Sequence, residues 1–244
     1  MSLFLDIPYS EKEEAKKLGA KWNPKVKKWY TNDMPEDYTK FSKWILKDSD
    51  NAIIATEYIY IIEGQQNCWK CKRSTKIIGL GIGKFFHMYK TTDGNLQYEF
   101  FNDYIEPGAE LHLAWVEKEE DIPPKLLHYI KENYSVKTGY SKTLKENCFS
   151  NYCDCCNSLQ GNWFLFDEPN SPLSSNINGN SELIERISKL KIYGIPIEDD
   201  LQLNWSINLC SNDYSYFKYG KFKELILSSN PENDYISYKE LYNI

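Results

Sequence analysis

Two cysteine pairs carry the clearest chemical signal in the sequence. Cys68 and Cys71 enclose two residues, and Cys153 and Cys156 repeat that spacing after the 81 residues 72–152. The two-residue spacing lets both sulfurs of a pair converge on one cation, and two such pairs complete the tetrahedral four-thiolate shell that zinc favours. The pattern therefore predicts one structural zinc ion (Zn2+) held by Cys68, Cys71, Cys153 and Cys156.

The remaining cysteines leave other ligand sets open. Cys155 could replace Cys153 or Cys156, and Cys148 could serve through a wider spacing. A disulfide or redox role is less favoured, because neither pair begins a helix after a strand as a thioredoxin-like site does. Cys210 is predicted to be a buried apolar cysteine.

The other residues of chemical interest do not assemble into a catalytic pattern. A catalytic zinc site keeps an open position, commonly beside His and carboxylate ligands, and four thiolates leave none. His87, His112 and His128 lie on different predicted elements, and His112 is expected to be a half-exposed strand residue. The glycines of residues 79–83 lack the spacing of a nucleotide-binding loop and predict a strand bend or bulge. We therefore expect that the protein is not an enzyme.

Lysines and aromatic residues alternate near the N-terminus, as they do in platforms for single-stranded nucleic acid. The interpretation that we favour is that Trp22, Trp29 and Trp44 form the core of a small domain, with lysines on its surface. If the segment does bind nucleic acid, the candidate contacts are Lys21, Lys25, Lys27, Lys28 and Trp29.

Residues 1–47 combine several short motifs in a fixed order: LDIPY at 5–9, EAKKLGAKWNP at 14–24, KWY at 28–30, and Phe41 with Trp44. In these motifs the segment resembles DUF5710, a small family of bacterial domains of unknown function. Such domains are often appended to larger proteins of plasmids and other mobile elements. The resemblance covers about a fifth of the chain and implies a mobile-element context, but it assigns no catalytic residue.

Secondary-structure signals place these motifs in an α+β protein. Within residues 1–47 we expect strands at 3–6, 20–22 and 28–30, a helix at 10–18 with a capping box of Ser10 and Glu13, and a last helix capped by Asp33. After a linker at 48–51, strands are expected at 53–62, 76–82, 85–90, 96–101, 111–117, 163–166, 192–197 and 203–209. Helices are expected from Pro123-Pro124 to Asn133 and at 181–191.

These elements predict a small N-terminal α/β module at 1–47 followed by a β-rich domain at 52–244 that contains a four-cysteine zinc ribbon. Residues 168–180 have the composition of a loop or linker and could mark a further boundary within the second domain.

Composition bounds the function classes. The chain has 244 residues, 15% aromatic residues and a formal net charge of −6, which argues against a general nucleic-acid binder. Its N-terminus lacks the pattern of a secretory signal, and no apolar run approaches the roughly 20 residues that span a bilayer. We therefore expect a cytoplasmic protein without a membrane partner.

Two function hypotheses follow. The first is a non-enzymatic, zinc-stabilised protein-interaction protein, for example an immunity or accessory factor of a bacterial toxin or mobile-element system, whose acidic surface would suit a basic protein partner. The alternative is a nucleic-acid-binding accessory protein of a plasmid or phage that contacts DNA or RNA through the N-terminal Lys/Trp module. The sequence predicts no oligomeric state.

Overall fold

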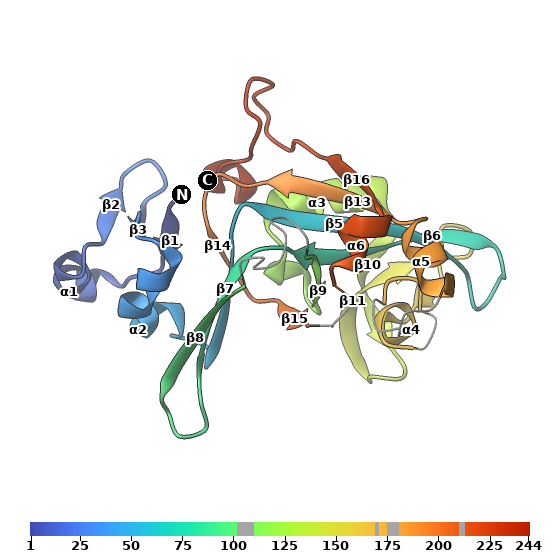
Figure 1. Cartoon of the computed structure of the whole chain (residues 1–244), viewed down its shortest axis with the longest axis horizontal. Coiled ribbons are helices and arrows are strands. Elements are labelled where there is room, and N and C mark those ends of the chain that lie inside the picture. Colours follow the sequence, from blue (N-terminus) through green and yellow to red (C-terminus); the bar gives the residue numbers. More distant parts are fainter. Residues whose placement is uncertain (102–109, 169–170, 175–180, 210–212) are drawn as a thin grey trace.

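The computed structural model describes residues 1–101, 110–168, 171–174, 181–209 and 213–244, and it is a strand-rich mixture of helix and strand (Figure 1). This confirms the expected mixed class. The described strands form four sheets of three, three, four and six strands. Neighbouring strands within them run antiparallel, apart from one parallel pair at the end of the largest sheet.

The N-terminal segment forms a three-stranded sheet with helices beside it, at the left of Figure 1. Its strands follow the order β1-β3-β2, with bounds Leu3–Leu5, Lys28–Thr31 and Lys21–Asn23. The helical elements are η1 (Tyr9–Glu11), α1 (Lys12–Lys17), η2 (Pro35–Phe41) and α2 (Ser42–Ile45). The predicted caps are wrong, because no side chain caps these helices and Asp33 instead pairs with Lys40 at 2.8 Å.

Two sheets form the centre of the larger part. The four-stranded sheet has the order β14-β4-β7-β8, with bounds Leu201–Leu203, Asn51–Ala55, Phe85–Lys90 and Leu96–Phe101. The six-stranded sheet has the order β15-β9-β6-β5-β13-β16, with bounds Ser206–Asn208, His112–Trp115, Ser74–Ile82, Tyr58–Asn67, Lys191–Pro196 and Lys221–Glu224.

Helices cover both faces of the six-stranded sheet, which explains why β5 begins with an unbroken apolar run. Ile59 and Ile61 pack in one buried cluster with α3 (Pro124–Asn133), while Tyr60 and Ile62 pack in another on the opposite face. The helices that contribute to that second cluster are α4 (Asn162–Phe166), α5 (Ser181–Ile187) and α6 (Ser215–Tyr219). A short helix, α7 (Tyr238–Leu241), joins the first cluster.

A third, smaller sheet carries the second cysteine pair. It has the order β10-β11-β12, with bounds Val136–Ser141, Glu146–Tyr152 and Leu159–Gln160. The 3-10 turn η3 (Glu119–Asp121) and α3 precede it in the chain.

Several predicted boundaries change in the structure. The expected strand at 53–62 is two strands, β4 and β5, separated at Glu57, whose φ is +61°. Residues 163–166 are helical, not a strand, because a short aromatic run fits either state and only tertiary packing decides between them. The glycines at 79–83 produce no bulge, since β5 and β6 pair without interruption from Ile59↔Ile82 to Asn67↔Ser74.

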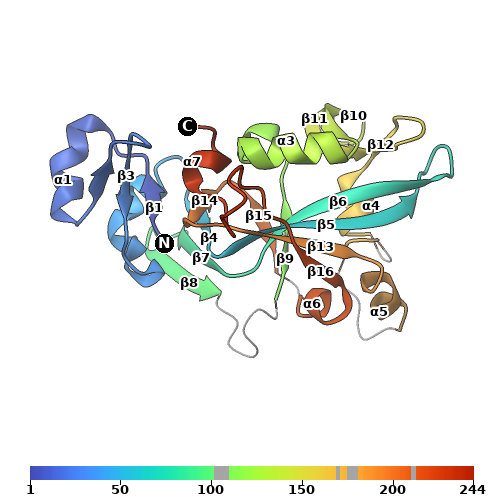
Figure 2. The ribbon, with the colours of Figure 1, turned by 90° about the horizontal axis from the view of Figure 1, so that it is seen from above.

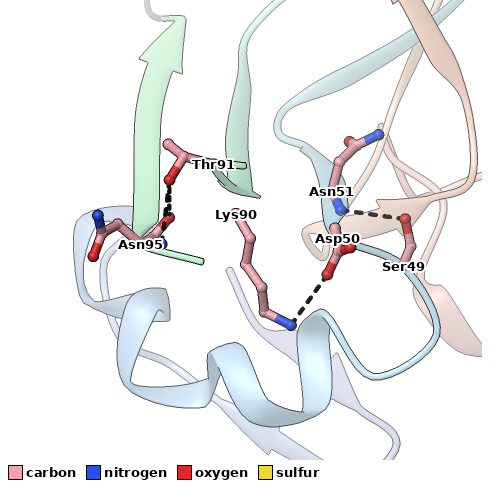
Figure 3. A network of polar contacts seen from close by, with 6 residues as sticks. All are labelled: Ser49, Asp50, Asn51, Lys90, Thr91 and Asn95. Carbon is pink, nitrogen blue, oxygen red and sulfur yellow. Dashed lines mark hydrogen bonds and ion pairs between the residues drawn. The ribbon is translucent and has the colours of Figure 1, made fainter. Parts of the chain in front are cut away.

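The segment predicted as a linker is held against the four-stranded sheet (Figure 3). Lys90 Nζ lies 3.3 Å from an oxygen of Asp50, and the backbone N–H of Asn51 donates to Ser49 Oγ at 3.2 Å. Directly after Lys90, at the same end of β7, Thr91 and Asn95 close the expected hairpin turn through a 2.9 Å backbone hydrogen bond.

The N-terminal module shares its core with the larger part. Tyr38, Phe41 and Trp44 belong to one buried cluster with Ile54 and Phe86 of β4 and β7. The predicted boundary at residues 47–52 therefore separates two segments that pack on each other, and the division into two domains stays a prediction.

Asp200 provides a second set of contacts between the N-terminal module and the larger part. Its backbone N–H donates to the carbonyl of Ser2 at 3.0 Å, and its carboxylate accepts a hydrogen bond from the Tyr38 hydroxyl. Burial raises the pKa of Asp200 to about 6, although the bond from Tyr38 opposes that shift. The other expected boundary, at 168–180, falls mostly outside the described residues, but Leu173 is buried in the core.

Candidate metal centre

Each cysteine pair lies in the turn of a β-hairpin. The first knuckle (residues 68–72) joins β5 to β6, and the second knuckle (residues 153–157) joins β11 to β12. Their backbones match: the N–H of Lys72 donates to the Cys68 carbonyl and the N–H of Asn157 to the Cys153 carbonyl, both at 2.9 Å. Lys72 and Asn157 adopt left-handed φ values of +63° and +54°. The two turns are therefore equivalent in shape despite different sequences.

The hairpins bring the four predicted ligands together. The sulfurs of Cys68, Cys71, Cys153 and Cys156 all lie within 4.8 Å of one another. Cys68 and Cys156 are 3.6 Å apart, as are Cys71 and Cys153. A disulfide is about 2.05 Å long, so these are free thiols, compatible with a metal site.

The alternative ligands lie outside this cluster. Cys155 is exposed, and only its backbone N–H takes part, donating to the Cys153 sulfur at 3.4 Å. Cys148 is buried in β11 and its sulfur lies 3.3 Å from Ser150 Oγ. Cys210 lies outside the described residues, so its predicted burial stays a prediction.

The cluster favours ionised sulfur at some positions and resists it at others. Burial raises the pKa of the Cys68 thiol, but hydrogen bonds from the backbone of Cys71 and Lys70 outweigh it and lower that pKa to about 6. A backbone bond from Arg73 lowers the pKa of Cys71, yet burial and the neighbouring sulfurs raise it to about 12. Four thiolates repel one another, so a cation at their centre would stabilise all four together.

Side chains around the cluster fasten one knuckle to the other. Gln160 Nε2 donates to the Cys68 sulfur at 3.5 Å and to the Ser158 carbonyl at 2.8 Å, while Gln66 Nε2 donates to Gln160 Oε1 at 3.1 Å. The Trp69 indole N–H reaches across to the Leu159 carbonyl at 2.7 Å. The geometry of the site is thus built by both hairpins.

Two further residues of the second hairpin bond to the β6 strand of the first. The buried Asn151 amide accepts from the Ile78 N–H at 2.8 Å and donates to the Ile78 carbonyl at 2.9 Å. Asp154 accepts from Thr75 Oγ1 and from the Lys76 N–H at 3.1 and 3.0 Å. Sequence reasoning missed the roles of Asn151, Asp154 and Gln160. The only available signal in the sequence was that all three lie within a few positions of Cys153 or Cys156.

The structure places the predicted nucleic-acid contacts on β2, on β3 and in the turn between them. Lys21, Lys25 and Lys27 are exposed, whereas Lys28 is half-buried with its Nζ 2.5 Å from Asp6. Trp29 is only 7% exposed, so its ring belongs to the core. The expectation of three core tryptophans holds for Trp29 and Trp44. It is wrong for Trp22, which is 49% exposed and meets Trp29 edge-on at 5.6 Å.

The histidines occupy three different environments. His112 is buried, not half-exposed as expected, and its Nδ1 lies 2.7 Å from Asp213 while its Nε2 lies 3.4 Å from Glu110. His128 faces Glu132 on the exposed side of α3. Burial lowers the pKa of His87. The three histidines therefore share no common site, and none belongs to the sulfur cluster.

Comparison with known proteins adds one match. In the described part of the chain no helix combines the length and the apolarity needed to cross a membrane. No curated protein and no solved structure matches the chain. Residues 2–45 match the family model described as domain of unknown function (DUF5710), which confirms the resemblance of the N-terminal segment.

Proposed function

We propose that this chain is a zinc-stabilised, non-enzymatic interaction protein with a zinc-ribbon-type centre. The observation that carries the proposal is the pair of matching knuckles, with sulfurs 3.6 Å apart across them. Tetrahedral zinc with Zn–S distances of about 2.3 Å separates its sulfurs by about 3.8 Å. Four thiolates fill that shell, so the ion would support the fold and leave no position for a substrate.

Zinc at this site would tie together segments that lie far apart in sequence. Cys68 and Cys71 would hold the β5–β6 hairpin, and Cys153 and Cys156 the β11–β12 hairpin, which closes a loop of residues 72–152. The ion would thereby fix the small sheet on the large one and stiffen the surface that the two hairpins share.

The proposed partner is another protein. The net charge of −6 would steer a basic partner toward this chain, because complementary fields speed association and improve specificity. The setting that we propose with it is a bacterial mobile-element or toxin system, in which an immunity or accessory factor is a fitting role.

A second candidate is nucleic-acid binding by the N-terminal module. The observation that favours it is the exposed group of Lys21, Lys25 and Lys27 next to the half-exposed ring of Trp22. Because Trp29 is buried, Trp22 would be the stacking surface.

Two measurements test these proposals. Elemental analysis of the purified protein should find one zinc per chain, and its absence would overturn the zinc proposal. Affinity purification from the source organism, with and without nuclease, should retain a stoichiometric protein after nuclease treatment. Recovery of nucleic acid, or of proteins that nuclease releases, would instead support the second candidate. Its binding should weaken steeply with salt and with replacement of Lys21 and Trp22.

A further inference from the structure

A large cavity lies beside the first knuckle. Its volume is about 1300 Å³, and its walls come from the end of β5, the β10–β11 turn, the segment from β12 into α4, and the segment from α5 into β13. Small-molecule sites commonly measure about 300–1,000 Å³. The space is therefore large enough for a segment of a macromolecule.

One wall of the cavity is an open strand edge. Strand β13 pairs with β5 only along residues 58–63, while β5 continues to Asn67 in partnership with β6. In Figure 2 the β5–β6 hairpin extends beyond β13. Along residues 64–67 no other described strand takes the place that β13 leaves. All of residues 63–67 line the cavity. Alternate side chains of a strand point to opposite faces, so a cavity on one face would be lined by every second residue. The unbroken run therefore means that the cavity borders the edge of the strand.

Exposed aromatic side chains surround this edge. Trp69 lies in the first knuckle, Tyr140 at the end of β10, and Trp163 and Phe164 at the start of α4. All four line the cavity and are between 52% and 62% exposed. Clustered exposed aromatic rings mark binding surfaces, and Trp and Tyr are enriched among the residues that dominate binding energy.

The charge of the lining differs in sign from that of the whole chain. Among the described residues that line the cavity, Lys142, Arg186, Lys189 and Lys191 are basic and Glu63 and Glu168 are acidic, a local excess of +2 in a protein of net charge −6. Lys191 pairs with Glu63 at 2.7 Å and Lys189 with Glu185 at 2.8 Å. Among the described residues Lys142 has no ion-pair partner, so it is the cation best placed to meet an acidic group.

We propose that this cavity receives an extended, acidic segment of the otherwise basic partner protein, which adds a β-strand to the open edge of β5 at residues 64–67. Backbone hydrogen bonds along about 13 Å of edge would supply register. The rings of Trp69 and Trp163 would contact apolar side chains of the segment, and Lys142 a carboxylate. A peptide is favoured over a nucleic-acid strand because only a peptide offers the alternating N–H and C=O groups that a strand edge pairs with. The inference rests on the proposed function and names the part of the partner that binds.

The test uses the zinc-loaded full-length protein and linear dodecapeptides selected by phage display. Enriched peptides should combine β-branched or aromatic residues with Asp or Glu. Synthetic versions should bind at least tenfold more weakly to Trp163→Ala and about fivefold more weakly to Lys142→Glu. The matched control Trp22→Ala, at a tryptophan of similar exposure on the other part of the molecule, should change binding less than twofold. N-methylation of alternate peptide amides should abolish binding, because it removes the edge hydrogen bonds.

Several results would overturn this proposal. They are failure to enrich any peptide, unchanged binding by Trp163→Ala, or tolerance of N-methylation. Tight binding of a twelve-nucleotide oligothymidylate that Trp163→Ala abolishes would show that the cavity takes nucleic acid instead. If the affinity-purified partner is retained equally by Trp163→Ala and Lys142→Glu, the cavity proposal fails while the proposed function stands. If no partner is retained at all, the proposed function fails.

Discussion

Replacing both proposed ligands of the second knuckle tests the metal centre and the cross-link together. The double variant Cys153→Ser/Cys156→Ser leaves the first knuckle intact but removes the proposed metal cross-link between the two hairpins. The matched control is Cys155→Ser, because Cys155 lies between the two ligands, is exposed, and keeps its sulfur out of the cluster. Both variants change side chains of the same tight turn.

The magnitude follows from the length of chain that the metal closes. Residues 72–152 form a loop of 81 residues between the two knuckles. In the chain-entropy treatment of cross-links, closing such a loop removes about 15 cal/mol/K from the unfolded chain, or about 4.5 kcal/mol at 25 °C. With a urea dependence of about 3 kcal/mol per molar, suited to a chain of this size, the unfolding midpoint should fall by about 1.5 M.

The assay is urea unfolding followed by tryptophan fluorescence and circular dichroism at saturating zinc. The wild type treated with a chelator should unfold at the midpoint of the double variant, and the chelator should not shift the double variant further. Cys155→Ser should unfold within about 0.2 M of the wild type, as exposed surface substitutions usually do. If the midpoint of the double variant decreases by less than about 0.5 M, or if that of Cys155→Ser decreases equally, the assignment of these ligands is refuted.

Three further predictions concern single positions. Asn151→Ala should lower the free energy of unfolding by about 2–5 kcal/mol, because it removes two buried hydrogen bonds and leaves two backbone groups of β6 unpaired. Urea titration measures this loss. An equal loss in the exposed control Asn147→Ala would contradict the prediction. Lys72→Gly should be neutral or stabilising by up to about 1 kcal/mol, since the left-handed backbone suits glycine, and a clear loss of stability would show that the turn does not adopt this conformation. The raised pKa of Asp200 means that the folded state binds its proton more tightly than the unfolded chain. Its contribution of up to about 3 kcal/mol is therefore present at low pH and lost as pH rises from about 4 to about 6. Asp200→Asn should keep the hydrogen bond from Tyr38 and flatten the stability profile between pH 4 and 7; a profile identical to that of the wild type would contradict the shift.

The sequence by itself identified the four cysteines that come together, and much of the local structure. The repeated two-residue spacing singled out Cys68/Cys71 and Cys153/Cys156, because a tight turn presents both sulfurs of a pair on one side; the fold then brings the two pairs together. Strands β7 and β8 appear at the predicted residues since their ends carry turn signals. The N-terminal motifs identified the DUF5710-like segment, because their order and spacing extend over the whole module.

Tertiary structure decided where long-range contacts outweigh local preference. His112 is buried beside Asp213, which lies 101 positions away in sequence. Residues 163–166 are helical, and Leu165 packs in one buried cluster with Ile62 of β5. The same holds for Asn151, whose amide bonds to a strand 73 positions away. The cavity edge at residues 64–67 exists because β13 begins at Lys191 opposite Glu63, whereas β5 continues to Asn67. Pairing lengths between distant strands depend on the whole sheet, so no local pattern encodes them.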